Sequence, residues 1–159
     1  MADQRFQGRF QWDANPDEYN YIRSLWLEHV TAEEVLFVDH TEAEGKRNLD
    51  IVINTLADDC TFELVQTGEK WTGLDGARKF YNTFLAAFSR MKWVPQAIVI
   101  GPQGVLDVAN MTGLLNVPFA DLKQTGKQVE LQWVIYFPWN RAAKKFEGEI
   151  VYSIRPVVK

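Results

Sequence analysis

The segment LADDCTFELVQTGEKWTGLDGARKFYNTFLAAF, residues 56–88, contains the clearest succession of local patterns in the chain. Its run CTFELV is rich in residues that favour strands, and the QTGEKWTG that follows is typical of a turn. A helix is predicted from about residue 74 to residue 88, because apolar residues recur on one helical face at Ala77, Phe80, Tyr81, Phe84 and Phe88. The segment therefore predicts a strand, a turn and a helix in that order.

The residues before this segment predict two further helices. Asn15-Pro16 is typical of a helix start, with Asn15 as the N-cap and proline at the first helical position. Thr31 and Glu34 have the spacing of a capping box, so we expect this helix to restart or bend there. A second helix is predicted over residues 48–57, where apolar residues recur with helical spacing at Leu49, Val52, Ile53 and Leu56.

The residues after the segment are strand-like from Trp93 onward. The runs are WVPQAIVIG, VLDVANMTGLL, VELQWVIYFPW and KFEGEIVYSI, and GPQGV (residues 101–105) is predicted to be a hairpin turn rather than a phosphate loop. Helices followed by a run of strands predict an α+β fold, with a mostly antiparallel sheet covered on one face by helices.

The composition is that of an ordinary globular protein. The 159 residues are 47% apolar and 24% charged, which predicts a single domain over residues 1–159, with residues 1–14 as an N-terminal arm. A net charge of −4 argues against nucleic acid as a partner, and no apolar run is long enough for a membrane span or a signal peptide. The single cysteine, Cys60, excludes an intrachain disulfide and Cys-based metal clusters, and we expect a cytoplasmic location.

Two parts of the chain carry a resemblance to a known family. Residues 56–88 resemble a pattern of Ala-Asp-Asp at a helix end, a short strand, two glycines and a helix with Phe-Tyr. The run TGK…VELQWVIYF and the final GEIVYSI resemble a Thr-Gly-Lys turn with a long strand and a closing strand. Together they resemble the SnoaL-like (polyketide-cyclase-like) branch of the nuclear transport factor 2-like superfamily. This resemblance implies a cone-shaped fold, in which about three helices close over a curved sheet and leave a pocket.

The resemblance also implies where catalytic groups are expected. SnoaL-like cyclases resemble one another in an Asp near the end of the last strand and an assisting His, and these positions fall on Ile154 and Leu115 here, neither of which can transfer a proton. The isomerase-like pattern places a general base at Leu64, with Glu63 beside it. Neighbouring strand residues point to opposite faces, so Glu63 points away from the pocket if Leu64 points in, unless a local bulge reverses this.

Two other proton-transfer candidates come from position in the chain. Asp107 has the strand parity of Met111 and Leu115, so it would face the pocket if Leu115 does; the alternative is a carboxylate at a hairpin edge. His40, at the end of the first helical region, is a candidate proton shuttle. Its alternative role is a helix-end histidine bound by a carbonyl or by Glu44.

No metal or cofactor is expected. His29 with Glu33 and His40 with Glu44 are pairs at i and i+4, and no third ligand is evident in the sequence.

The aromatic strand VELQWVIYFPW is consistent either with a ligand pocket or with a core filled by aromatic side chains. One of its faces is apolar throughout, and the other becomes apolar at Val134 and Tyr136. The resemblance implies a homodimer through this outer sheet face, because the fold often pairs there. The expected pocket walls include Met111, Leu115 and Trp133, with hydroxyl groups from Tyr81 and Tyr152. Such a pocket suits a small apolar or aromatic molecule, polyketide-like or steroid-like.

Two functions are consistent with these features. The first is binding of such a molecule with acid/base isomerase, cyclase or dehydratase chemistry through atypical residues, for which Glu63, Asp107 and His40 are the candidates. The alternative is a non-catalytic ligand-binding or dimerisation module, favoured by the aliphatic residues Leu115 and Ile154 at the usual cyclase positions.

Overall fold

The computed structural model describes residues 8, 10–13 and 15–158. Within them the chain forms helices α1 (Pro16–Phe37), α2 (Glu42–Asn54) and α3 (Gly73–Ala87). The strands are β1 (Leu56–Leu64), β2 (Glu69–Thr72), β3 (Phe88–Gly101), β4 (Gly104–Leu115), β5 (Lys127–Asn140) and β6 (Lys145–Pro156). They form one sheet in the order β2-β1-β6-β5-β4-β3, in which β1 and β6 run parallel and the other neighbours antiparallel.

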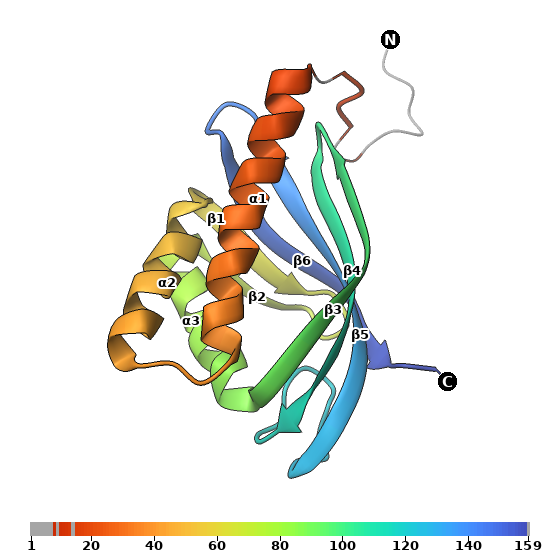
Figure 1. Ribbon diagram of the computed structural model, residues 1–159. Helices are drawn as coiled ribbons and strands as arrows, with labels where there is room; N and C mark the ends of the chain where they lie inside the picture. Colours follow the sequence, from red (N-terminus) through yellow and green to blue (C-terminus); the bar gives the residue numbers. More distant parts are fainter. Residues whose placement is uncertain (1–7, 9, 14, 159) are drawn as a thin grey trace.

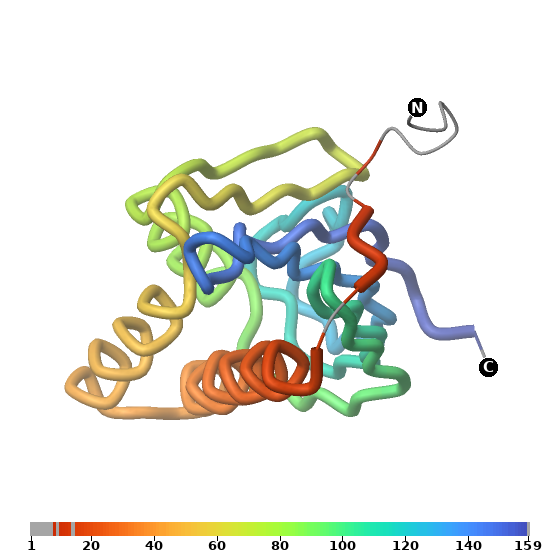
Figure 2. Tube along the Cα trace, turned by 90° about the horizontal axis from the view of Figure 1, so that it is seen from above, coloured from red at the N-terminus to blue at the C-terminus, as the bar shows by residue number. Residues whose placement is uncertain are grey.

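The predicted α+β fold is confirmed, with a curved sheet and all three helices on one side of it. Figure 1 shows α1 running across the sheet, while α2 and α3 lie next to β1 and β2. Figure 2, which looks nearly along α1, shows α2 leading away from that helix toward β1. The apolar core fills the space between the helices and the strands. None of the helices in the described part of the chain has the length and apolar character that crossing a membrane requires.

Helix α1 begins as predicted and does not bend. The Asn15 side chain accepts a hydrogen bond from the Glu18 backbone N–H at 2.8 Å, which caps the first turn. The prediction of a restart at Thr31 is wrong, because the helix continues to Phe37 with Ala32 and Leu36 buried on its inner face. Burial of that continuous face outweighs the local capping signal.

Helix α2 begins six residues earlier than predicted. Thr41 and Glu44 form the capping box, with Thr41 Oγ1 accepting from the Glu44 N–H at 3.1 Å and the Thr41 N–H donating to Glu44 at 3.4 Å. The predicted range of residues 48–57 is therefore wrong at both ends, since Leu56 already opens β1. The hairpin turn at residues 101–105 is confirmed by the pairing of Gly101 with Gly104.

The predicted N-terminal arm lies largely outside the described residues, and Phe6 is among those not described. In its described part, Phe10 stacks on Trp12 with ring centroids 5.7 Å apart. The Gln11 amide donates to the Pro102 carbonyl at 3.4 Å, and Arg141 donates to the Asp13 carbonyl at 2.7 Å. These bonds join residues 11–13 to the β3–β4 and β5–β6 turns.

Gly148 sets the path of β6. The β5–β6 pairing is irregular between Tyr136 and Trp139, and Gly148, on the facing part of β6, has a φ of +111°. A Cβ atom at this position would collide with the backbone carbonyl of Thr61 on β1. Glycine therefore permits both the backbone conformation and the close approach of β1, immediately before Glu149.

We predict that Gly148→Ala lowers the free energy of unfolding by roughly 3 kcal/mol or more, because it combines a left-handed φ with a backbone collision. Gly68→Ala is the matched control, because Gly68 has a φ of +78° but nothing within 4 Å of its would-be Cβ. It should cost about 1 kcal/mol. Urea denaturation followed by circular dichroism measures both, and equal losses would contradict the role of the close approach.

Candidate active site

A cavity of about 110 Å³ lies between α1, α3 and the inner face of the sheet. Aromatic residues are the largest group in its lining, and we call them the aromatic wall: Trp26, Phe37, Phe80, Tyr81, Phe84, Trp93, Trp133 and Phe137. Four carboxylates also line it, Glu33, Glu34, Asp107 and Glu149, whereas no described lining residue is a Lys, Arg or His. The site thus combines aromatic rings with acidic groups.

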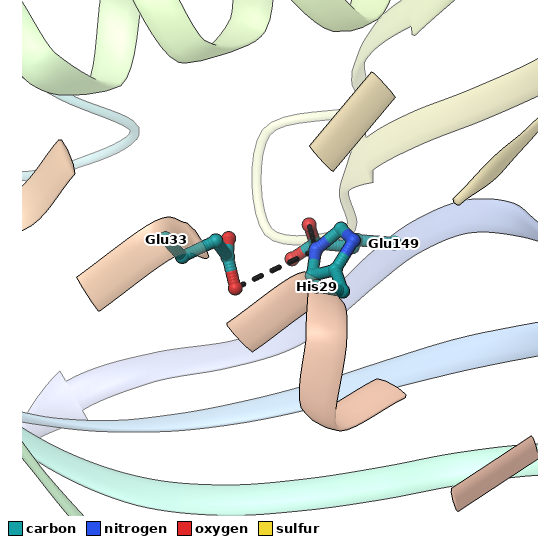
Figure 3. A group of neighbouring side chains, drawn as sticks. All are labelled: His29, Glu33 and Glu149. Atoms are coloured by element: carbon teal, nitrogen blue, oxygen red, sulfur yellow. Dashed lines mark hydrogen bonds and ion pairs between the residues drawn. The ribbon is translucent and has the colours of Figure 1, made fainter. Parts of the chain in front are cut away.

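Four side chains from three elements meet at one end of the cavity, and we call them the His–Glu–Tyr cluster: His29 and Glu33 on α1, Tyr81 on α3 and Glu149 on β6. His29 Nε2 lies 3.3 Å from Glu149 Oε2 and 3.5 Å from Glu33 Oε1. The Tyr81 hydroxyl lies 2.7 Å from Glu33 Oε2 and 2.8 Å from Glu149 Oε2. Figure 3 shows His29 and Glu33 reaching from α1 toward Glu149 on the strand.

Helical periodicity brings the α1 members of the cluster inside. Ile22, Trp26, His29 and Glu33 follow one another at three- and four-residue steps, and all are buried. Tyr81 lies on the buried face of α3 with Ala77 and Phe84. Glu149 follows Gly148, where the irregular path of β6 leaves it only 4% exposed.

The hydrogen bonds of Thr55 determine where one proton of His29 lies. The Thr55 hydroxyl donates to the Val52 carbonyl at 2.7 Å, so toward His29 Nδ1, also 2.7 Å away, it can only accept. Nδ1 therefore carries a hydrogen. Nε2 faces two carboxylates and is best satisfied by a second hydrogen, which makes the ring an imidazolium.

Electrostatics agree with a charged His29. Complete burial alone would lower its pKa, but Glu33 and Glu149 more than reverse this and raise the pKa to about 10. Burial and the charge of Glu33 raise the pKa of Glu149 above its ordinary value. Burial, with Glu149 and Glu33, also raises the pKa of Tyr81, so its hydroxyl stays neutral.

The Tyr81 hydroxyl has one hydrogen and two carboxylate neighbours. It can donate to only one of them, so its other short contact requires a proton on the second carboxyl group. Glu149 is the group whose raised pKa fits this role. His29 therefore carries a positive charge and the Tyr81 hydroxyl is neutral, while one proton is shared between Tyr81 and the two carboxyl groups. The cluster thus stores an exchangeable proton beside the cavity.

Asp107 also lines the cavity, but its carboxylate lacks the hydrogen bonds that stabilise the cluster. It lies on β4, and no hydrogen bond or ion pair of its side chain occurs among the described residues; its Oδ1 is buried without a partner. Burial, followed by the charges of Glu33 and Glu149, raises its pKa from 3.8 to about 7. A carboxylate with this pKa exchanges a proton readily at neutral pH.

His29, Glu33 and Glu149 also offer three metal-ligand atoms within 4.8 Å of one another. The sequence showed only the first two, and the fold adds the third. The Tyr81 hydroxyl, however, is 2.7, 2.8 and 3.3 Å from these three groups and lies among them. Together with the His29–Thr55 bond, this arrangement fits a hydrogen-bonded network better than a site shaped around an ion.

Three of the residues proposed from sequence meet at the cavity, namely Asp107, Tyr81 and Trp133. Met111 and Leu115 are buried with them on the inner face of the sheet but do not line this cavity. Ile154 is likewise a buried core residue.

The other proposed residues lie elsewhere. Leu64 is buried, and Glu63 is half-buried, with Lys70 of the neighbouring strand 4.0 Å away, as the outward orientation predicts. His40 is exposed, and its Nδ1–H donates to the Val38 carbonyl at 2.8 Å, which matches the alternative of a helix-end histidine. Tyr152 is 50% exposed and does not line the cavity.

Sequence reasoning missed His29, Glu33 and Glu149 as members of one site. A signal for the first two was present, because both continue the apolar face of Ile22 and Trp26, where buried polar groups need partners. Glu149 gave no such signal, because the orientation of its side chain depends on the irregular strand pairing at Gly148.

We predict that Tyr81→Phe lowers the free energy of unfolding by about 2 kcal/mol, because the two carboxyl groups lose the hydroxyl between them. Tyr152→Phe makes the same chemical change at an exposed site and should leave stability within about 0.5 kcal/mol of the wild type. Denaturant titration compares the pair, and a harmless Tyr81→Phe would argue against the network.

We predict that Asp107→Asn is more stable than the wild type at pH 8. Because the pKa of Asp107 is about 7 in the folded state and ordinarily 3.8, its favourable contribution is complete below pH 4 and is lost as the pH rises through 7. At pH 8 the difference should be on the order of 3 kcal/mol, shrinking toward pH 4. Thermal denaturation of both proteins across this range measures it, and a pH-independent difference would contradict the assignment.

The chain is similar to known proteins both in its sequence and in its fold. A family model described as the SnoaL-like domain matches residues 37–144. No curated protein matches the chain. A protein from Jannaschia sp. CCS1 described as a SnoaL-like polyketide cyclase has a TM-score of 0.66 and 15% identity, over 89% of this chain and 90% of that one. These matches confirm the resemblance expected from sequence.

Other solved structures share the fold with different described activities. One from Kribbella flavida DSM 17836, described as a ketosteroid isomerase, has a TM-score of 0.59 and 14% identity, over 89% of this chain and 82% of that one. AclR from Streptomyces galilaeus, described as a hydroxylase, has a TM-score of 0.58 and 17% identity, over 86% and 76%. Identity this low shows the fold alone.

Proposed function

Because the chain belongs to the SnoaL-like domain family, we propose that it binds a small, largely apolar molecule in the cavity and catalyses proton transfer on it, as an isomerase, cyclase or dehydratase that uses no cofactor. One observation carries this proposal. Asp107, with a pKa of about 7 and no hydrogen-bonding partner among the described residues, lines the same cavity as Tyr81, Glu33 and Glu149. Two groups able to exchange protons thus share one apolar space.

Asp107 is the proposed general base. Its ionised fraction at neutral pH is substantial, and its apolar surroundings keep the carboxylate poorly solvated and therefore reactive toward a proton of the bound molecule. Since none of its oxygens is occupied by a described donor, the carboxylate is free to contact the ligand.

The His–Glu–Tyr cluster is the proposed second proton-transfer group. Glu149 shares a proton with the Tyr81 hydroxyl, and His29 contributes a positive charge beside Glu149. When charge develops on a ligand oxygen, a neutral Tyr81 or Glu149 can donate to it from a site of low dielectric. In this proposal, Asp107 and the cluster take over the roles of the cyclase His and Asp, whose positions are occupied by Leu115 and Ile154 in this chain.

The cavity limits the size of the ligand. At about 110 Å³ it is smaller than an engineered cavity of about 150 Å³ that accommodates benzene. A steroid or a multi-ring polyketide would fit only if the cavity enlarged, so we propose a molecule no larger than a single ring. The homodimer through the outer sheet face and the cytoplasmic location stay predictions.

Exchange of carbon-bound hydrogen tests the acid/base function without a known substrate. Small enolisable ketones, such as cyclopentanone and cyclohexanone, are incubated with the protein in D2O, and loss of the α-hydrogen signal is followed by NMR. We expect exchange above the buffer rate that rises with pH through about 7, and a loss of about 100-fold or more in Asp107→Asn. Glu28→Gln, an exposed carboxylate-to-amide change on α1, is the control.

A non-catalytic ligand-binding protein is the second candidate, favoured by the buried aliphatic residues Leu115 and Ile154. It predicts that the ketones perturb the indole N–H signals of the cavity tryptophans while exchange stays at the buffer rate. That result would overturn the acid/base proposal and leave the binding proposal standing.

A further inference from the structure

We propose that the natural ligand of the cavity carries a positive charge, as a small organic ammonium ion. This deepens the proposed function, on which it rests for the cavity and for the role of Asp107, by naming the substrate class. Three features of the site carry it: the charge of the lining, the aromatic wall and the volume.

The lining has an uncompensated negative charge. Its four ionisable acidic residues face no Lys, Arg or His among the described lining residues. Within the His–Glu–Tyr cluster, the one cation, His29, lies between two carboxyl groups, so the cluster offers the cavity no surplus positive charge. This leaves Asp107 in the wall and Glu34 at the exposed rim without a described cationic partner. A cationic ligand supplies the missing charge, whereas an anionic ligand would add to the repulsion.

The aromatic wall suits the same class of ligand. Trp133 packs against Trp93 and Phe84, with ring centroids 5.3 and 5.7 Å away, and the group continues to Phe37 beside Trp93. Ring faces attract cations through their quadrupole, and tryptophan does so most strongly. A desolvated cation–π contact stabilises a bound cation, whereas neutral ligands of equal shape do not gain it. The wall thus prefers an alkylated ammonium group to a fully hydrated metal cation.

The volume and the position of Asp107 complete the site. A cavity of about 110 Å³ matches an ammonium group with a few methyl groups, or a single ring that extends toward the rim. Asp107 on β4 and the cluster on α1, α3 and β6 border this one space. An ammonium group beside Asp107 also stabilises its ionised form, which is the form that a general base requires.

Matched ligands of equal shape test the charge. Tetramethylammonium and tert-butanol each have five non-hydrogen atoms and differ mainly in charge, and benzylammonium with benzyl alcohol forms a ring-sized pair. Binding is measured at pH 8 by NMR titration of the indole N–H signals, in the wild type, in Asp107→Asn and in the exposed control Glu28→Gln.

We expect the cation of at least one pair to bind on the order of tenfold or more tightly than its neutral partner. Asp107→Asn should reduce this preference by about tenfold, while Glu28→Gln should leave it unchanged. Equal affinities within both pairs, no saturable binding of either cation, or a preference that survives in Asp107→Asn would each overturn the proposal.

The ligand-binding test and the ketone-exchange test can fail independently of each other. Cation preference without hydrogen exchange would retain the charged ligand and remove the acid/base function. Exchange without cation preference would do the reverse. Because Asp107→Asn is expected to gain stability, a loss of cation binding in that variant cannot be attributed to unfolding, and its thermal denaturation curve verifies this in the same sample.

Discussion

The central constraint on this structure is the burial of ionisable groups between α1 and the sheet. His29 is completely buried, and Glu33 and Glu149 are nearly so. Charged groups are stable in such a place only when they are paired and hydrogen-bonded, which Thr55, Tyr81 and the two glutamates achieve together. Removal of one partner leaves the others unsatisfied, so the cluster fixes two helices, α1 and α3, and one strand, β6, relative to one another.

The same constraint shapes the chemistry of the cavity. The cluster fills its own hydrogen-bonding needs and holds its two carboxyl groups against His29, whereas Asp107 has neither a donor nor a counter-charge among the described residues. The pKa of Asp107 is therefore raised because its carboxyl group is buried near other carboxyl groups and no described residue donates a hydrogen bond to it. Both the proton-transfer proposal and the charged-ligand proposal follow from this asymmetry between a satisfied cluster and an unsatisfied carboxylate.

Local sequence patterns predicted most of the architecture and part of the site. The strands after Trp93, the helix at α3 and the N-cap at Asn15 were all readable, because propensity, periodicity and capping act over a few residues. The start of α2 was predicted too late, because the apolar pattern begins only at Leu49, whereas the capping box of Thr41 and Glu44 starts the helix earlier. Asp107, Tyr81 and Trp133 were found from strand parity and helix faces, whereas His40 and Glu63 lie away from the cavity.

The sequence by itself determined the order of helices and strands, the family resemblance and which residues could face inward. Only the tertiary structure decided that His29, Glu33, Tyr81 and Glu149 share one buried site. Glu149 lies 120 residues from His29, and its contact depends on a parallel β1–β6 pairing and on the positive φ of Gly148. The physical reason is that helical and strand periodicities are local, whereas the pairing of buried charges requires segments far apart in the chain to close around them.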